Sequence, residues 1–274
     1  MRIGIVHPAL AEAALEATFR RAAQAGAEGV EVHYASPAFA HALDEPMHAR
    51  ELQAAAASSG VAIPSLCLDF LAGQPYLIGR PEVIETGQQQ VRRALRCAAE
   101  AGAAMVVVPF FGRNAIELEE ELTRASDALL GLLDDAEEAG VVLAVESTLA
   151  FHQQEFLLAQ LGNTGSVLVS CNTAVALSRK MDAATGIRQI GAAAIGLVRF
   201  KDVRITEGLP PDFSVPLGRG NVDFGTVAQA LRAVSYDGWV IAEPPLDAET
   251  LQDPTASAAR AIHFTRELLA PASG

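Results

Sequence analysis

Apolar and amphipathic segments alternate along the chain in a repeating order. An Ala-rich amphipathic run, a glycine and a short apolar run recur around residues 22–26, 98–102 and 136–140, and a related phrase stands at 236–238. Each glycine is predicted to end a helix, because glycine adopts the left-handed conformation at little cost and lets the chain turn back into a buried strand. The pattern therefore predicts repeated helix–strand units.

Eight apolar segments are predicted to be strands, with helical patterns between them. They are residues 2–6, 30–33, 62–68, 105–108, 142–146, 167–172, 195–201 and 239–243. Their apolar residues are continuous instead of alternating, which indicates parallel strands covered on both faces. Eight such units favour an α/β fold, a single (β/α)8 TIM barrel over residues 1–274. A doubly wound sheet is the weaker alternative, because no GxGxxG follows the first strand.

Composition and charge indicate which kinds of partner and which cellular compartment to expect. The chain is 50% hydrophobic and carries a formal net charge of -13, which suits a large core and argues against nucleic acid as a partner. Neither a leader pattern nor a long apolar stretch stands out, so we expect a cytoplasmic protein without a membrane partner. Three cysteines, Cys67, Cys97 and Cys171, lack metal-site spacing and are expected to be reduced and without chemistry.

One segment is too long for a simple connection between strand and helix. Residues 207–221 contain three prolines and three glycines after the seventh predicted strand. Long loops without secondary structure of their own are commonly functional, so this segment is expected to form a lid loop at the barrel mouth.

Polar residues stand where the apolar strands give way to the following loops. In a barrel, that end of the strands carries the active site. The candidates are His7, Glu31, His33, Asp69, Glu146, Asn172, Arg199, Lys201, Asp202 and Glu243. Glu146 and Glu243 each follow an apolar run, and a carboxylate there needs a partner. Each carboxylate taken alone is explained equally well by a structural ion pair and by a functional role. The two together favour a functional site.

Several segments in the C-terminal half resemble the xylose-isomerase-like barrels, the sugar-phosphate isomerase and epimerase superfamily. They are LAVES at 143–147, FKDV at 200–203, PLGRGNVDF at 216–224 and YDGWVIAE at 236–243, with GVE at 29–31 as a looser match. The resemblance implies a TIM barrel and one divalent metal, held by a Glu after strand five, an Asp after strand six, a His in strand seven and a Glu after strand eight. Glu146 and Glu243 match the two Glu positions, whereas Asn172 replaces the Asp and Arg199 the His.

The two replacements predict an altered metal site. An Asn oxygen is a weak neutral ligand, and a guanidinium cannot bind a cation. We therefore expect no cofactor; the alternative is Mn²⁺ or Mg²⁺ held by Glu146, Asn172 and Glu243. Arg199 is predicted to stand in for the metal charge, by bridging Glu146 and Glu243 or by clamping an anionic substrate. An internal salt bridge without a catalytic role is the competing interpretation.

These features predict an isomerase or epimerase that acts on a small sugar, keto-sugar or polyol derivative by proton transfer next to a carbonyl. Glu146 and Glu243 are the expected catalytic residues. The expected substrate-binding residues are His7, Glu31, His33, Asp69, Asn172, Arg199 and Lys201. Two alternatives stay open: a non-catalytic barrel that binds a sugar acid, and a related dehydratase or lyase. The expected partner is a small carbohydrate, and a homo-oligomer is compatible with the sequence.

Overall fold

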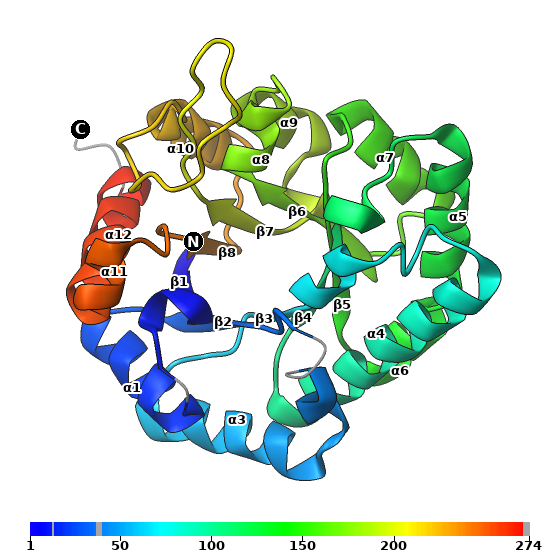
Figure 1. Ribbon diagram of the computed structural model, residues 1–274, viewed down its shortest axis with the longest axis horizontal. Coiled ribbons are helices and arrows are strands. Elements are labelled where there is room, and N and C mark those ends of the chain that lie inside the picture. The colour runs from blue at the N-terminus through cyan, green and yellow to red at the C-terminus, as the bar shows by residue number, and fades with distance from the viewer. Residues whose placement is uncertain (13, 37–39, 271–274) are drawn as a thin grey trace. The chain divides into compact units, whose positions relative to one another are not determined.

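The described chain folds into a closed barrel of parallel strands in sequential order (Figure 1). The computed structural model describes residues 1–12, 14–36 and 40–270, so the last four residues of the predicted domain lie outside the described part. The strands are β1 (Arg2–Val6), β2 (Gly29–His33), β3 (Ser65–Cys67), β4 (Met105–Phe110), β5 (Val142–Ser147), β6 (Val167–Asn172), β7 (Ile195–Phe200) and β8 (Trp239–Ala242). The predicted (β/α)8 fold is confirmed.

Seven predicted strands lie within a few residues of the observed ones, and the third is shorter than predicted. Residues 62–68 were expected to form it, but β3 spans only Ser65–Cys67. Ala62 makes an isolated bridge to Gly29, and Pro64 then interrupts the pairing, because proline has no backbone N–H to donate.

Helices follow the strands and carry the amphipathic runs. The α-helices are α1 (Leu15–Ala25), α3 (Pro46–Ser59), α4 (Pro81–Ala101), α5 (Glu119–Leu130), α6 (Leu133–Ala139), α7 (Phe151–Gln160), α8 (Thr173–Ser178), α9 (Ala183–Ile190), α10 (Phe224–Ala233), α11 (Ala248–Gln252) and α12 (Pro254–Leu269). Short 3-10 helices are η1 (His7–Leu10), η2 (His41–Asp44), η3 (Asp69–Gly73), η4 (Gly112–Asn114) and η5 (Ala192–Ala194). Among the described residues, no helix combines the length and the apolarity needed to cross a membrane.

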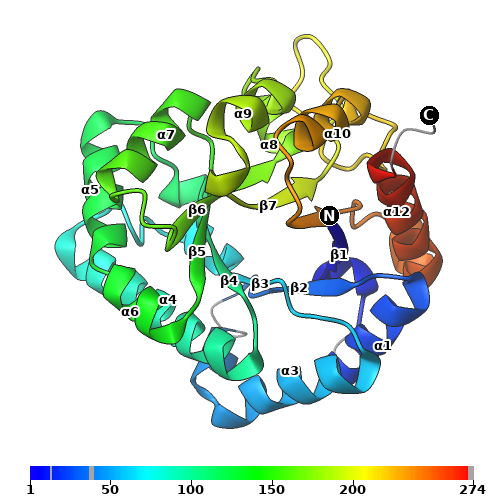
Figure 2. The same cartoon turned by 180° about the vertical axis from the view of Figure 1, so that it is seen from behind.

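The chain divides into two compact units, and each has its own packing. Unit 1 comprises Met1–Glu31, Ala55–Ala62 and Cys171–Gly274, and unit 2 comprises Val32–Ala54 and Ile63–Ser170. In unit 1, α12 lies along α1, as both ribbon views show (Figures 1 and 2). In unit 2, α4 lies along α6. The expectation of one domain over residues 1–274 stays a prediction.

Three of the four predicted helix-ending glycines have that role, and the fourth does not. Gly26, Gly102 and Gly140 follow their helices with φ of 83°, 77° and 63°, in the left-handed region. Gly238 does not, because α10 already ends at Ala233. Its own constraint is space: a Cβ there would lie 2.5 Å from the Tyr236 hydroxyl oxygen, which bonds to the Gly196 and Trp239 carbonyls.

This close approach makes Gly238 sensitive to a single methyl group. Gly238→Ala is expected to lower the free energy of unfolding by about 1–3 kcal/mol, because Tyr236 must move away from its two carbonyl partners. Gly73→Ala is the matched control, since a Cβ at Gly73 has no neighbour within 4 Å. Urea denaturation followed by circular dichroism measures both. Equal stability of the two variants would contradict the packing argument.

Candidate functional site

A buried ion-pair cluster in unit 1 joins β2, β7 and the end of β8. Arg199 of β7 is 3% exposed and Glu31 of β2 is fully buried. The Arg199 Nη2 atom lies 2.7 Å from Glu31 Oε1, and Arg199 Nε lies 3.5 Å from Glu243 Oε2. A buried guanidinium requires such partners, because an uncompensated charge in the interior costs several kcal/mol. The predicted pairing of Arg199 with Glu243 is present, and Glu31 is a partner that the sequence argument did not assign to it.

Glu243 lies between two cations and keeps one oxygen free of hydrogen bonds. The Lys201 Nζ atom donates a short hydrogen bond to Glu243 Oε1. Within the described chain, Glu243 Oε2 is buried and accepts no hydrogen bond, although the Arg199 charge lies nearby. The side chains of Glu243 and Lys201 are 15% and 25% exposed, so both remain accessible from solvent. The arrangement gives a carboxylate that can take up a proton beside an accessible ammonium group.

Thr173 holds the carboxyl end of β7 in place, a role that the sequence argument missed. Its hydroxyl donates to the Lys201 carbonyl at 2.6 Å and accepts from the Lys201 amide at 3.1 Å. It also lies 3.2 Å from the Arg199 carbonyl. Thr173 is fully buried. Nothing in a single threonine after a strand signals this role, because its partners are 26 and 28 residues away.

Asn172 uses its side-chain oxygen to begin a helix. Its Oδ1 atom accepts from the amides of Ala174 and Val175 at 3.1 and 3.2 Å, and so caps the N-terminus of α8. Capping by Asn is a common way to satisfy the first amides of a helix. The contact with substrate predicted for Asn172 stays a prediction, and its oxygen has a structural use.

The divalent metal implied by the resemblance does not fit this set of residues. Both carboxylate oxygens of Glu243 face cations, from Lys201 and Arg199. The Asn172 oxygen is committed to backbone amides. A guanidinium stands at the position of the expected His ligand and is already paired with Glu31. These residues therefore form a cluster of carboxylates paired with cations, which does not offer the ligand set of a divalent metal.

The predicted lid segment, residues 207–221, is fixed at its base and reaches Lys201. Buried Asp202 accepts from the amides of Gly220 at 2.8 Å and Val222 at 3.2 Å. A Cβ at Gly220 would lie 2.3 Å from Asp202 Oδ1, so the chain can pass here only as glycine. The ring of Phe213, in the same segment, lies 5.8 Å from Lys201 Nζ. Closure of the segment over a ligand stays a prediction.

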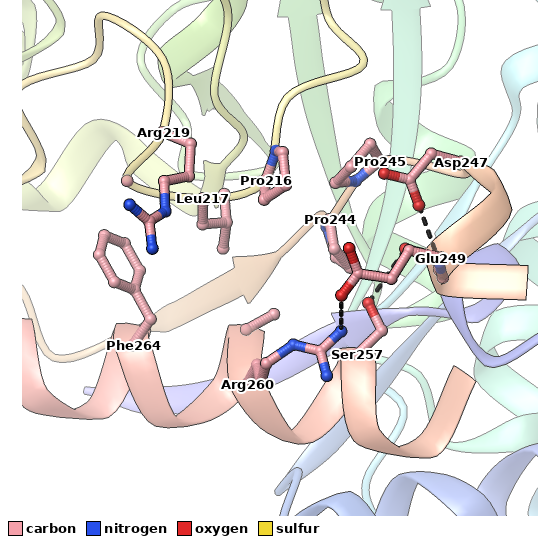
Figure 3. A pocket seen from close by; sticks show the side chains of 13 residues that line it. Pro216, Leu217, Arg219, Pro244, Pro245, Asp247, Glu249, Ser257, Arg260 and Phe264 are labelled. Atoms are coloured by element: carbon pink, nitrogen blue, oxygen red, sulfur yellow. Dashed lines mark hydrogen bonds and ion pairs between the residues drawn. The ribbon is translucent and has the colours of Figure 1, made fainter. Parts of the chain in front are cut away.

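A cavity of about 540 Å³ lies beside the chain segment that follows β8 (Figure 3). Its lining includes Pro244, the residue directly after Glu243, together with the loop at Pro216–Arg219 and residues of α11 and α12. Arg260 is paired with Glu249 at 2.9 Å, whereas the Arg219 guanidinium has no ion pair among the described residues. Asp247 also lines the cavity. A hydrogen bond from the Thr250 amide to its carboxylate lowers the pKa of Asp247.

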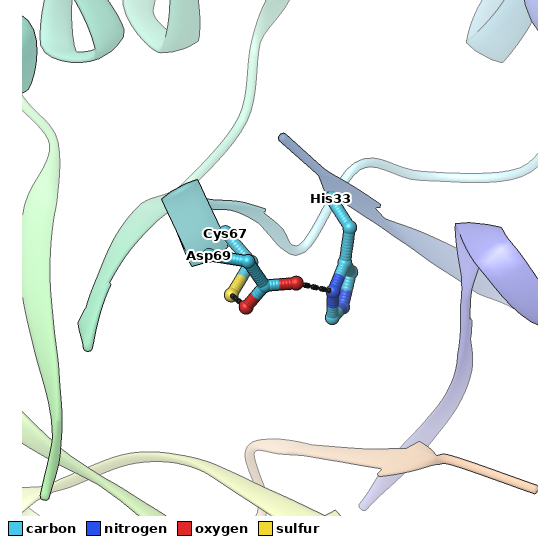
Figure 4. A group of neighbouring side chains, drawn as sticks. All are labelled: His33, Cys67 and Asp69. Atoms are coloured by element: carbon cyan, nitrogen blue, oxygen red, sulfur yellow. Dashed lines mark hydrogen bonds and ion pairs between the residues drawn. The ribbon is translucent and has the colours of Figure 1, made fainter. Parts of the chain in front are cut away.

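The other predicted site residues lie in different places. His7 is half-buried at the start of η1 in unit 1. Glu146 is 2% exposed near the end of β5 in unit 2. Unit 2 also brings His33 and Asp69 together with Cys67, as Figure 4 shows. Cys67 was expected to have no chemistry, and its place beside two predicted site residues is not visible in cysteine spacing.

Comparisons with known proteins agree with the fold. A model of the xylose isomerase-like TIM barrel family matches residues 19–268. The 2-epi-5-epi-valiolone 7-phosphate 2-epimerase of Actinoplanes sp. is 31% identical over 162 residues, which are 59% of this chain and 58% of the relative. The chain thus matches little more than half of that protein's length.

Solved structures are similar over nearly the whole chain. The 3-keto-D-glucoside 4-epimerase YcjR of E. coli aligns with a TM-score of 0.77 at 20% identity, over 97% of this chain and 99% of its own. The IolI protein, solved with a bound zinc atom, aligns with a TM-score of 0.79 at 15% identity, over 98% of both chains. At these identities the likeness concerns the fold.

The charge cluster predicts that Mn²⁺ does not bind tightly to the ligand set of Glu146, Asn172 and Glu243. At an effective dielectric of about 20, a unit positive charge about 4 Å from a divalent ion costs about 8 kcal/mol before screening. Calorimetric titration of Mn²⁺ into the Cys67→Ala protein is expected to show no tight site, and Arg199→His with Asn172→Asp in the same background is expected to gain one.

The Cys67→Ala background removes the thiol that lies beside His33 and Asp69 from the measurement. A stoichiometric Mn²⁺ site without the two added substitutions, lost in Glu243→Gln, would overturn the account. The titration without the two added substitutions therefore tests the absence of a tight Mn²⁺ site even if the variant that carries both does not fold.

Proposed function

Because this chain belongs to the xylose isomerase-like TIM barrel family, we propose that it is an isomerase or epimerase of small sugars, keto-sugars or cyclic polyols. The observation that carries the proposal is the placement of Glu243. Its Oε2 atom is buried without a hydrogen bond, and its Oε1 atom is bonded to the accessible ammonium group of Lys201. A base beside a cation is what proton abstraction next to a carbonyl requires.

In the proposed reaction, the Glu243 carboxylate takes the proton from the carbon next to the substrate carbonyl. The electron pair of that C–H bond moves to the carbonyl oxygen and forms an enediolate. Lys201 stabilises the negative oxygen, because its ammonium group is partly exposed and can move from Glu243 to the substrate. Arg199 holds the carboxylate in position from the buried side.

The second half of the reaction returns a proton to carbon or oxygen. In an epimerisation the proton must arrive on the opposite face, so a second proton carrier is needed. We assign that role to Glu146, which ends an apolar strand segment and is 2% exposed. His7 and His33 remain the proposed polar contacts of the substrate hydroxyl groups.

A phosphorylated substrate is favoured over a free sugar. The curated relative is named for a 7-phosphate substrate. Here, the cavity lined by Pro244, the residue after Glu243, is also lined by Arg219, which has no ion pair in the described chain. The loops after the last two strands are a common phosphate-binding position in TIM barrels. We therefore assign Arg219 to the phosphate of the substrate.

The proposal also includes a cytoplasmic location and a small-molecule partner. All three cysteines are buried and form no disulfide, which supports a cytoplasmic location. The net charge of -13 supports a small-molecule partner over nucleic acid. Association into a homo-oligomer remains compatible with this function.

Exchange of the substrate proton with solvent tests the proposal. The protein is incubated in D₂O with ketoses and cyclic polyol ketones, each with and without a phosphate ester, and NMR follows the signal of the proton next to the carbonyl. We expect exchange with at least one phosphorylated compound, reduced at least about 100-fold in Glu243→Gln and in Glu146→Gln. Glu138→Gln, an exposed carboxylate of α6, is the control and should exchange at the wild-type rate.

Two results would contradict the proposal. Binding of a panel compound without proton exchange would favour a non-catalytic binding barrel. Exchange that survives in Glu243→Gln would show that another group removes the proton.

A further inference from the structure

Three side chains of different chemistry converge at the carboxyl ends of β2 and β3 in unit 2. His33 and Cys67 are the last residues of these strands and are direct partners in the parallel register. Asp69 follows two residues after Cys67 and begins η3. One ligand-type atom from each of the three residues lies within 4.8 Å of the others (Figure 4). The convergence follows from strand pairing, so the backbone fixes two of the three positions.

The Asp69 carboxylate lies between the imidazole and the thiol. Its Oδ2 atom is 2.6 Å from His33 Nδ1, and its Oδ1 atom is 3.2 Å from Cys67 Sγ. His33 and Cys67 are 6% and 1% exposed, whereas the Asp69 side chain is 27% exposed. The nitrogen and sulfur ligands are therefore shielded, and the oxygen ligand is open on one side.

We propose that His33, Cys67 and Asp69 bind a zinc ion, or another borderline-soft divalent ion such as Co²⁺. Nitrogen, thiolate and carboxylate are the three ligand types that zinc accepts. Mg²⁺ and Ca²⁺ require oxygen ligands, so the thiol excludes them as the preferred ions. Three protein ligands with one open side leave a fourth position for a water molecule or a ligand oxygen.

The hydrogen bonds of the metal-free trio keep the ligands close to the positions that the ion needs. Tetrahedral zinc with bonds of about 2.0–2.3 Å separates its ligand atoms by about 3.4–3.6 Å. The Cys67–Asp69 separation of 3.2 Å is already near this value. The His33–Asp69 separation of 2.6 Å must widen, which rotation of the partly exposed Asp69 side chain allows.

Loading the site changes the protonation of two ligands. The thiol proton that bonds to Asp69 is released to solvent, and the thiolate binds the ion. His33 must also present the Nδ1 lone pair to the metal, so the proton between Nδ1 and Asp69 is given up there and the neutral ring carries its proton on Nε2. Binding should therefore weaken as the pH falls, since protons compete for the same atoms.

Titration of the chelator-treated full chain with Co²⁺ tests the proposal without any substrate. We expect one equivalent to bind, with a thiolate-to-cobalt charge-transfer band and intense visible bands of a tetrahedral site. Zn²⁺ should then displace the cobalt and remove the bands. In Cys67→Ala the charge-transfer band should be lost, and in His33→Ala and Asp69→Asn the affinity should fall by more than about 100-fold, beyond the effect of outer partners.

Cys97→Ala is the matched control, because Cys97 is also a buried free cysteine of unit 2. Burial raises the pKa of its thiol to about 11, which makes it a poor thiolate source. Its bands should equal those of the wild type. A charge-transfer band that persists in Cys67→Ala, or its absence from the wild type, would overturn the proposal.

X-ray absorption of the zinc-loaded wild type gives a readout that needs no variant. One sulfur neighbour at about 2.3 Å together with nitrogen and oxygen neighbours at about 2.0–2.2 Å is expected. A zinc environment without sulfur would refute the site. Because neither measurement uses turnover, this result is independent of whether the protein is an epimerase.

Discussion

The buried charge of Arg199 is the constraint on which the unit 1 site depends. A guanidinium at 3% exposure cannot lose its charge, so the protein must supply carboxylates to it. Glu31, fully buried on β2, is the main partner, and Glu243 is the second. The pairing ties β2 and β7 to the segment after β8. It also explains why the cluster does not present the ligand set of a divalent cation.

Arg199 and Lys201 contact different oxygens of Glu243 and differ in exposure. Arg199 approaches from the buried side and orients the carboxylate, whereas Lys201 is 25% exposed and can reach a ligand. Thr173 fixes the backbone that carries both cations, because its hydroxyl contacts the carbonyls of both. In the proposed reaction, the Lys201 charge would stabilise the negative oxygen that forms on the substrate, while Arg199 orients the carboxylate.

The fold was predictable from the sequence because its signals are local. Continuous apolar runs, amphipathic helices and glycines such as Gly26 and Gly102 depend on neighbouring residues alone. Gly238 follows the same phrase but has a different role, because a tertiary contact with the Tyr236 hydroxyl decides it.

The sequence indicated one contact of the candidate site but not the others. The change of Arg199 from the family pattern indicated a charge pair, and Glu243 is one of its partners. Glu31 could not be predicted as the stronger partner, because it lies far from Arg199 in the sequence and only the fold brings the two side chains together. Cys67 was overlooked for the same reason: its neighbours come from strand register and not from sequence spacing.

A double-mutant cycle between Arg199 and Glu31 tests the central claim most directly, with the free energy of unfolding measured in urea. Arg199→Met and Glu31→Gln should each destabilise the protein strongly, by about 3–5 kcal/mol, because each removes a partner of a buried charge. The double variant should recover much of that loss and give a coupling energy of about 2–3 kcal/mol. Effects that add to within about 0.5 kcal/mol would mean that the two residues do not depend on each other, and would contradict the account.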